Sequence, residues 1–159
     1  MSKSKKTNAM RLLDQAKIEY RTIEYEVDEE NLAGEHVAEQ IHMPAEQVFK
    51  TLVARGVKKG ILVFCIPVNR ELNLKKAAAI AEDKKVELIH VKELLPLTGY
   101  IRGGCSPIGM KKKYPAFIDE SAILFDEISV SAGVRGCQII CNPTELIRYI
   151  DAIECDLAE

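Results

Sequence analysis

Lys50 is the residue whose surroundings in this sequence point most directly to chemistry. It stands in an apolar run with Val48, Phe49, Leu52 and Val53, a pattern typical of a buried strand rather than a solvated surface. Burying a lysine costs free energy, so one in such a run needs a partner or a function. It could polarise an ester carbonyl, bind a phosphate or form a Schiff base, or its stem could simply pack while the ammonium reaches water.

Two glycine-rich segments could add backbone donors to the same pocket. They are Arg102-Gly103-Gly104-Cys105-Ser106-Pro107-Ile108-Gly109 and Ser131-Ala132-Gly133-Val134-Arg135-Gly136. Glycines let a ligand approach the main chain closely, and bare N–H groups can stabilise developing negative charge. The simpler interpretation is a plain turn for the first segment and a hairpin with glycines at positive φ for the second.

The conventional catalytic groups are poorly placed in this sequence. Ser131 ends an expected strand, where its hydroxyl could point into a pocket, but it lacks a Gly-x-Ser-x-Gly elbow and a neighbouring histidine. The histidines and cysteines form no cluster at metal-ligand spacing, so we expect no metal and no cofactor. Cys65 is expected in the core, whereas Cys105 is the one thiol in a candidate site loop.

Length and composition bound the class of protein. The 159 residues, 47% hydrophobic and 29% charged, predict a single globular domain over residues 1–159. A net charge of -2 is not typical of a strong nucleic-acid binder, so such a substrate would need a local basic patch or a partner that presents it. The polar N-terminus, the absence of a membrane-spanning apolar run and five cysteines without a Cys-x-x-Cys pair indicate a cytoplasmic protein with reduced thiols.

The elements that must position these residues alternate irregularly. The patterns predict helices over 8–17, 34–42, 74–81, 91–95 and 143–150, and strands over 20–25, 48–55, 61–68, 86–89, 115–118, 123–125, 128–131 and 136–141. Pro96 is expected to end the fourth helix, and residues after 150 are expected to form an acidic tail. Irregular alternation with hairpin-like pairs favours an α+β fold built on a mixed sheet or barrel.

Four segments, in order along the chain, resemble the YbaK/ProX family of freestanding aminoacyl-tRNA deacylases, which are related to the editing domain of bacterial prolyl-tRNA synthetases. The segments are Phe49-Lys50-Thr51-Leu52, Leu72-Asn73-Leu74-Lys75-Lys76-Ala77-Ala78, Thr98-Gly99-Tyr100 with Gly103-Gly104 and Ser106-Pro107-Ile108-Gly109, and Ser131-Ala132-Gly133 with Arg135-Gly136. Any one of them is weak evidence, but all four in order are specific and cover nearly the whole chain. Within the family, the chain is most similar to the YbaK type, which hydrolyses Cys-tRNA(Pro).

The resemblance implies a fold and a set of site residues. The fold would be a curved, mostly antiparallel sheet or barrel flanked by helices. Lys50 would be the functional lysine and Gly103 the glycine whose backbone faces the substrate carbonyl, with the backbone of Gly103 and Gly104 stabilising the oxyanion. The implied substrate-binding residues are Tyr25, Thr51, Ser106, Ser131 and Gly133. Cys105 departs from the aliphatic residue expected after the two glycines, and either faces the core or alters the pocket.

The resemblance also implies a mechanism and partners. The cysteinyl thiol of the substrate would attack its own ester carbonyl, and the protein would orient the ester and stabilise the oxyanion. Expected partners are the acceptor end of aminoacyl-tRNA and prolyl-tRNA synthetase in a ternary complex, without a membrane. The alternatives are an Ala-tRNA(Pro) deacylase that uses a bound water, a non-catalytic module that binds tRNA or a synthetase, and an unrelated phosphate-binding protein.

Overall fold

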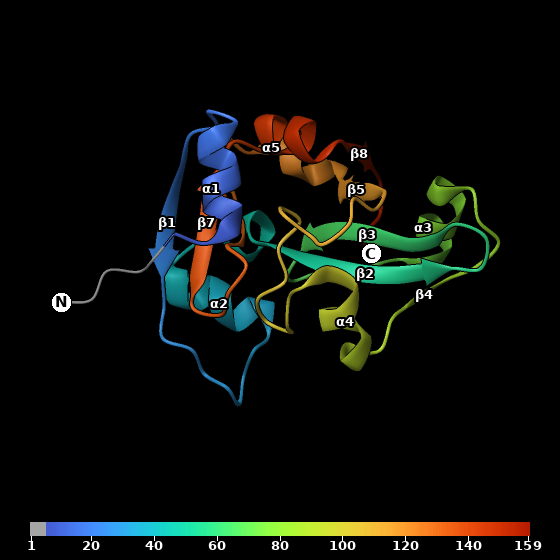
Figure 1. The fold of residues 1–159 in the computed structure, drawn as a ribbon, viewed down its shortest axis with the longest axis horizontal. Helices are drawn as coiled ribbons and strands as arrows, with labels where there is room; N and C mark the ends of the chain where they lie inside the picture. Colours follow the sequence, from blue (N-terminus) through green and yellow to red (C-terminus); the bar gives the residue numbers. More distant parts are fainter. Residues whose placement is uncertain (1–5) are drawn as a thin grey trace.

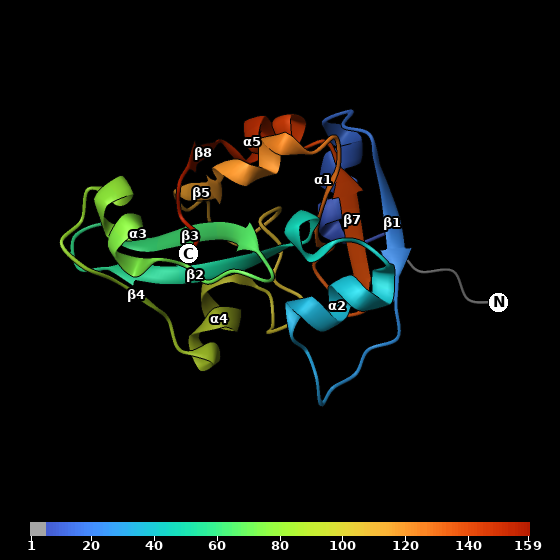
Figure 2. The ribbon, with the colours of Figure 1, turned by 180° about the vertical axis from the view of Figure 1, so that it is seen from behind.

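The computed structural model describes residues 6–159, which form two β-sheets with five α-helices around them (Figure 1, Figure 2). The strands are β1 (Tyr20–Glu24), β2 (Phe49–Gly56), β3 (Gly60–Pro67), β4 (Val86–Leu88), β5 (Ala116–Asp119), β6 (Ile128–Ser131), β7 (Cys137–Cys141) and β8 (Ala152–Cys155). The helices are α1 (Asn8–Gln15), α2 (Gly34–Ile41), α3 (Leu74–Ala81), α4 (Val91–Thr98) and α5 (Pro143–Ile150), with two 3-10 turns, η1 (Ala45–Gln47) and η2 (Glu120–Leu124).

The strands divide into a smaller and a larger sheet that stand side by side (Figure 1). The smaller sheet has the order β1–β7–β6, and both of its ladders are antiparallel. The larger sheet has the order β4–β2–β3–β5–β8, in which β2 pairs antiparallel with β3 and β4 while β3–β5 and β5–β8 are parallel. The predicted α+β class, with mixed but mostly antiparallel pairing, is confirmed.

Short polar caps begin three of the helices. The side chains of Thr7, Asn73 and Asn142 accept hydrogen bonds from backbone N–H groups in the first turns of α1, α3 and α5, at 3.0–3.2 Å. Each bond satisfies a donor that the helix itself leaves free. The helices that these caps start then bury one apolar face each against the sheets.

The β2–β3 hairpin carries Lys50 into the interior of the molecule. Lys50 pairs with Ile66, and Thr51 pairs with Cys65, along a ladder that closes at the Gly56–Gly60 turn. Just before β2, an isolated parallel bridge joins Val48 to Ser129 of β6 and so ties the larger sheet to the smaller one. Lys50 therefore lies where the two sheets meet.

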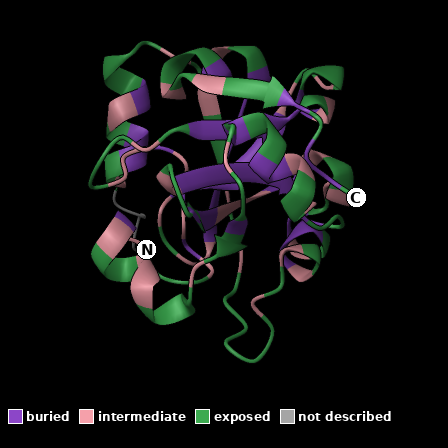
Figure 3. Ribbon diagram, turned by 90° about the vertical axis from the view of Figure 1, so that its right-hand side faces the viewer, coloured by how far each residue is buried: buried purple, intermediate pink, exposed green. Residues whose placement is uncertain are grey.

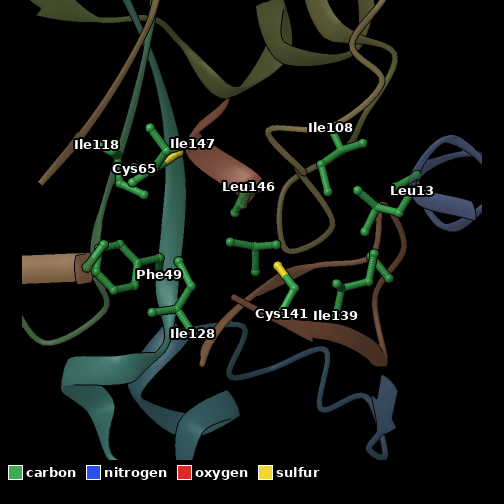
Figure 4. Packing of buried hydrophobic residues seen from close by; sticks show 14 of the residues in the cluster. Leu13, Phe49, Cys65, Ile108, Ile118, Ile128, Ile139, Cys141, Leu146 and Ile147 are labelled. Carbon is green, nitrogen blue, oxygen red and sulfur yellow. The ribbon is translucent and has the colours of Figure 1, made fainter. Parts of the chain in front are cut away.

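Two large apolar clusters hold the sheets and helices together. The cluster in Figure 4 joins α1, α5, β6 and β7, and its labelled members include Leu13, Phe49, Ile139 and Leu146. The second cluster packs α3 against the larger sheet, with the rings of Phe64 and Phe117 stacked at 5.2 Å between centroids. Figure 3 shows the buried residues concentrated in the sheets, with exposed residues on the outer faces of the helices. No helix in residues 6–159 is long and apolar enough to cross a membrane.

Three of the predicted elements are wrong. Pro96 lies inside α4 instead of ending it, because the Thr98 hydroxyl bonds the Leu94 carbonyl at 2.7 Å and Gly99 closes the turn at φ +87°. The predicted strand 123–125 is mostly occupied by the 3-10 turn η2, whose first turn is capped by Asp119. The predicted acidic tail contains β8, whose pairing with β5 is a long-range contact that the acid-rich local sequence hides.

Asp119 fixes this C-terminal segment to the sheet. One of its carboxylate oxygens accepts the N–H groups of Leu157 and Ala158 at 3.0 and 3.1 Å, and the other accepts the N–H of Ser121 at 3.2 Å. Burial by itself would raise the pKa of this carboxyl, but the hydrogen bonds outweigh burial and lower the pKa. The charged form is therefore the one that the fold stabilises.

We predict that Asp119→Ala lowers the free energy of unfolding by about 2–4 kcal/mol, because it leaves buried N–H groups without acceptors. In the wild type, this stabilisation is present above the unfolded carboxyl pKa and is lost as pH falls through the lower folded pKa. Urea unfolding between neutral and acidic pH measures both effects. A variant as stable as the wild type, or one with the same acid dependence, would contradict this role of Asp119.

Candidate active site

A cleft of about 100 Å³ opens at the junction of the two sheets. It is bounded by the start of β2, the start of α2, the glycine loop before β5 and the facing ends of β6 and β7. Its lining residues are Gly34, Val37, Val48, Phe49, Lys50, Thr51, Val68, Gly103, Cys105, Ser131 and Gln138. The three segments singled out in the sequence thus meet in one place.

Lys50 is the only cation among the residues that line this cleft. Its side chain is half-buried, and no carboxylate of residues 6–159 lies within 4.0 Å of its ammonium. Burial lowers the pKa of Lys50, while the more distant charges of Glu71 and Glu35 partly oppose that shift. An ammonium that is desolvated but not neutralised is suited to an anionic ligand group or to charge that develops during a reaction.

The position of Glu71 depends on the C-terminus. The backbone of Glu71 exchanges two hydrogen bonds with Glu159, at 2.9 and 3.3 Å, and Leu72 forms a bridge with Ala158. The segment that Asp119 anchors therefore also holds the acidic residue whose charge has the larger effect on the pKa of Lys50. A distant part of the chain contributes in this way to the electrostatics of the cleft.

The two glycines of the loop have different roles. Gly103 lines the cleft at φ +85°, and its N–H donates to no acceptor within residues 6–159. The N–H of Gly104 is already bonded to the carbonyl of Ile101 at 2.9 Å. A Cβ on Gly104 would lie only 3.0 Å from the backbone of Val134, so this glycine lets the two glycine segments approach each other. Gly103 is the glycine with a donor left for a ligand.

Thr51 and Ser131 line the cleft, and the hydroxyl of each already has a partner within the protein. The Thr51 hydroxyl lies 3.8 Å from the sulfur of Cys65 on the paired strand. The Ser131 hydroxyl accepts the N–H of Gly133 at 3.1 Å, which fixes the turn after β6. No histidine, aspartate or glutamate is among the lining residues, so neither hydroxyl has an adjacent base that would make it a nucleophile.

Three other predicted residues lie behind the cleft rather than on its wall. Tyr25 follows β1 and packs against the cluster that contains Val48 and Val68. The buried Ser106 hydroxyl accepts the N–H of Ile108 at 3.2 Å. Gly133 leaves room for the ring of Tyr100, from which a Cβ would be only 3.0 Å away. These residues shape the loops that form the cleft.

Gln138 is a lining residue that the sequence interpretation missed. It is buried in β7, and its side-chain oxygen accepts the hydroxyl of Ser129 at 2.7 Å. A polar residue within the apolar run Cys137–Cys141 is the same kind of signal that identified Lys50. Gly34 was also missed, and it is required because a Cβ there would collide with Val68.

Cys105 faces the cleft, but its thiol is not activated. Burial raises the pKa of Cys105 to about 12, so the sulfur is a neutral thiol near pH 7. The thiolate, and not the thiol, is the nucleophile in cysteine chemistry. Within residues 6–159, no group of three or more histidine, cysteine or acidic side chains is arranged to hold a metal ion. The cleft therefore contains one ammonium and one protonated thiol near pH 7.

Comparison with known proteins identifies the family. Residues 29–149 match the model described as the aminoacyl-tRNA editing domain. A curated relative from Enterococcus faecalis, named "Putative Cys-tRNA(Pro)/Cys-tRNA(Cys) deacylase EbsC", is 49% identical over 142 residues, which are 89% of this chain and 87% of the relative. The chain therefore belongs to the aminoacyl-tRNA editing domain family. It is an aminoacyl-tRNA deacylase, the class of enzyme that the four sequence segments predict.

More distant likenesses agree with this family. A proline–tRNA ligase from Thermosipho africanus is 32% identical over 78 residues, which are 49% of this chain and 14% of the ligase. A crystal structure described as "a putative trans-editing enzyme for prolyl tRNA synthetase" has a TM-score of 0.82 at 23% identity, covering 96% of this chain and 98% of that one. The structure of hypothetical protein APE2540 has a TM-score of 0.85 at 19% identity, covering 94% and 97%. The two structures support the fold alone.

We predict that Gly103→Ala and Gly60→Ala separate the loss of activity from the loss of stability. Both residues have positive φ, so each alanine costs about 1–2 kcal/mol of folding free energy. Gly60 has nothing within 4 Å of an added Cβ, whereas Gly103 lines the cleft and would contact Arg135 at 3.3 Å. Deacylation should fall about 100-fold in Gly103→Ala only. The expected loss comes from the added Cβ, because alanine keeps the N–H but narrows the cleft and disfavours the positive φ of the loop. Equal activity of the two variants, at similar melting temperatures, would contradict the placement of the ester against Gly103.

Proposed function

We propose that this protein is a trans-editing enzyme that cleaves the ester bond of mischarged Cys-tRNA(Pro). Three findings support the proposal: the editing-domain family, the name of the Enterococcus relative, and a cleft small enough to select the aminoacyl group. In this assignment the aminoacyl group enters the cleft, and the ester carbonyl lies near Lys50 and the free N–H of Gly103. Both groups then stabilise the negative charge that develops on the carbonyl oxygen.

The proposed mechanism rests on the chemical groups that line the cleft. The cleft wall offers one cation and the free N–H of Gly103, but no general base and no activated nucleophile among the lining residues. We infer that the substrate supplies the nucleophile. The cysteinyl sulfur attacks the ester carbonyl and forms a C–S bond, the C–O bond to tRNA breaks, and the thiol proton ends on the ribose hydroxyl. The product is a cyclic thiolactone, and the step consumes no water.

We further propose that selection of tRNA(Pro) comes from a ternary complex with prolyl-tRNA synthetase. The net charge of -2 supports weak, unselective contact with tRNA by this chain alone. The name of the Enterococcus relative includes both Cys-tRNA(Pro) and Cys-tRNA(Cys), which agrees with recognition of the aminoacyl group rather than of the tRNA body. The isolated protein should then cleave cysteine from either tRNA.

The first test measures deacylation of Cys-tRNA(Pro), Ser-tRNA(Pro), Ala-tRNA(Pro) and Cys-tRNA(Cys) by the isolated protein. We expect both cysteinyl esters to be cleaved and the seryl and alanyl esters to resist, because only cysteine carries the thiol. Lys50→Ala should lower the rate about 100-fold or more, whereas Lys58→Ala, in the exposed hairpin turn, should have no effect.

Other outcomes of this test point to other functions. Preferred cleavage of the alanyl ester would replace the thiol mechanism with attack by a bound water. Rejection of Cys-tRNA(Cys) by the isolated protein would contradict selection by the synthetase. Cleavage of none of the esters, with or without the synthetase, would leave a non-catalytic tRNA-binding module.

The pH dependence of the reaction should follow Lys50. Because burial lowers its pKa, the ammonium loses its proton below the ordinary lysine value of 10.5. Enzymatic cleavage, corrected for spontaneous hydrolysis, should therefore fall as pH rises through that lowered pKa. NMR titration of 13C-labelled lysine side chains locates the same pKa directly. A falling limb that does not coincide with the Lys50 titration would remove the ammonium from the mechanism.

A further inference from the structure

A second hollow, of about 290 Å³, adjoins the cleft on the α4 side. It shares four wall residues with the cleft: Lys50, Thr51, Gly103 and Cys105. The rest of its wall comes from β2, from the end of β4 and the start of α4, and from Arg102. The residues from β4 to α4 are Leu88, Ile89, His90, Val91 and Leu94. The cleft and this outer hollow therefore meet at a shared rim. The rim contains Lys50 and Gly103, the two residues proposed to contact the ester.

The wall of this outer hollow is apolar and open to solvent. Leu88 is 50% exposed and Val91 is 61% exposed, and they stand beside the half-buried Ile89 and Leu94. Exposed apolar side chains that line one hollow together are typical of a binding surface, whereas the same residues scattered singly would not be. The hollow lies next to the proposed ester site, so its occupant must be compatible with that chemistry.

The charges around the two spaces are distributed unevenly. Arg102 is exposed, and its guanidinium has no carboxylate within 4.0 Å among the described residues. Glu93 of α4 is not among the residues that line this hollow, and its carboxylate is held by Arg55 at 2.8 Å and by the N–H of His90 at 3.1 Å. On the α2 side of the cleft, residues 26–35 carry Glu26, Asp28, Glu29, Glu30 and Glu35. A polyanion leaving the cleft is repelled on the α2 side and is attracted toward Arg102.

We propose that the outer hollow binds the terminal adenosine of the aminoacyl-tRNA, with the base against Leu88 and Val91 and the 5′-phosphate near Arg102. This inference rests on the proposed function, because the ester joins the aminoacyl group to the ribose of that nucleotide. If the aminoacyl group occupies the inner cleft, the ribose must cross the shared rim and the base must lie just beyond it. Apolar side chains recognise the flat faces of an extruded base by stacking.

The test compares two small esters that differ only in the leaving group: the cysteinyl ester of AMP and cysteine methyl ester. For the wild type we expect a higher kcat/KM with the AMP ester. Leu88→Ser should lower the ratio of the two kcat/KM values about tenfold. Leu124→Ser is the matched control, since Leu124 is 78% exposed but lies outside the hollow, and its ratio should not change. Arg102→Ala should lower the rate with the AMP ester more than with the adenosine ester.

A binding measurement keeps this inference separate from the deacylase proposal. AMP added to methyl-labelled protein should shift the NMR signals of Leu88, Ile89 and Val91 and leave that of Leu124 in place. If no ester is cleaved but these shifts occur, the deacylase proposal fails and the nucleotide site stands. If the esters are cleaved but AMP causes no shift and Leu88→Ser leaves the ratio unchanged, the nucleotide site is wrong. Leu88→Ser is compared only after its folding has been checked by the same spectra.

Discussion

The chemistry of the cleft depends on one electrostatic constraint, a half-buried ammonium without a bound counter-charge. Lys50 is desolvated enough for burial to lower its pKa, yet the acids that influence it, Glu71 and Glu35, remain beyond ion-pair distance. A closer acid would neutralise the lysine, and full exposure would let water screen it. The structure holds Lys50 between these two limits, where it can interact strongly with charge that develops on a substrate.

Several long-range features of the fold maintain this state. The β2–β3 ladder fixes the backbone of Lys50 opposite Ile66, and the Val48–Ser129 bridge brings the second sheet to the same place. The C-terminal segment, anchored by Asp119, pairs with Glu71 and so fixes the distance of that charge. The close approach of the two glycine segments adds the free N–H of Gly103. The cleft is therefore a product of contacts between segments that lie far apart in the sequence.

Local sequence patterns predict those elements whose formation depends mainly on residues close together in the chain. The β2–β3 hairpin, the capped helices and the importance of Lys50 follow from apolar runs, turn residues and caps. The parallel pairing of β8, the continuation of α4 past Pro96 and the burial of Gln138 depend on distant partners, which a local pattern does not contain. Family resemblance singled out Gly103 as the glycine that faces the carbonyl and added Gly104 beside it, and the hydrogen bonds show that the N–H of Gly103 is free while that of Gly104 is occupied.

The central claim is that the protein supplies charge stabilisation and the substrate supplies the nucleophile. The most direct measurement is mass spectrometry of the small product from a single turnover of Cys-tRNA(Pro), quenched in acid at early times in 18O-labelled water. The account predicts that a cysteine thiolactone, lighter than cysteine by one water and free of label, appears first and then declines. Labelled cysteine formed at the earliest times, with no thiolactone before it, would show that water is the nucleophile and would contradict the account.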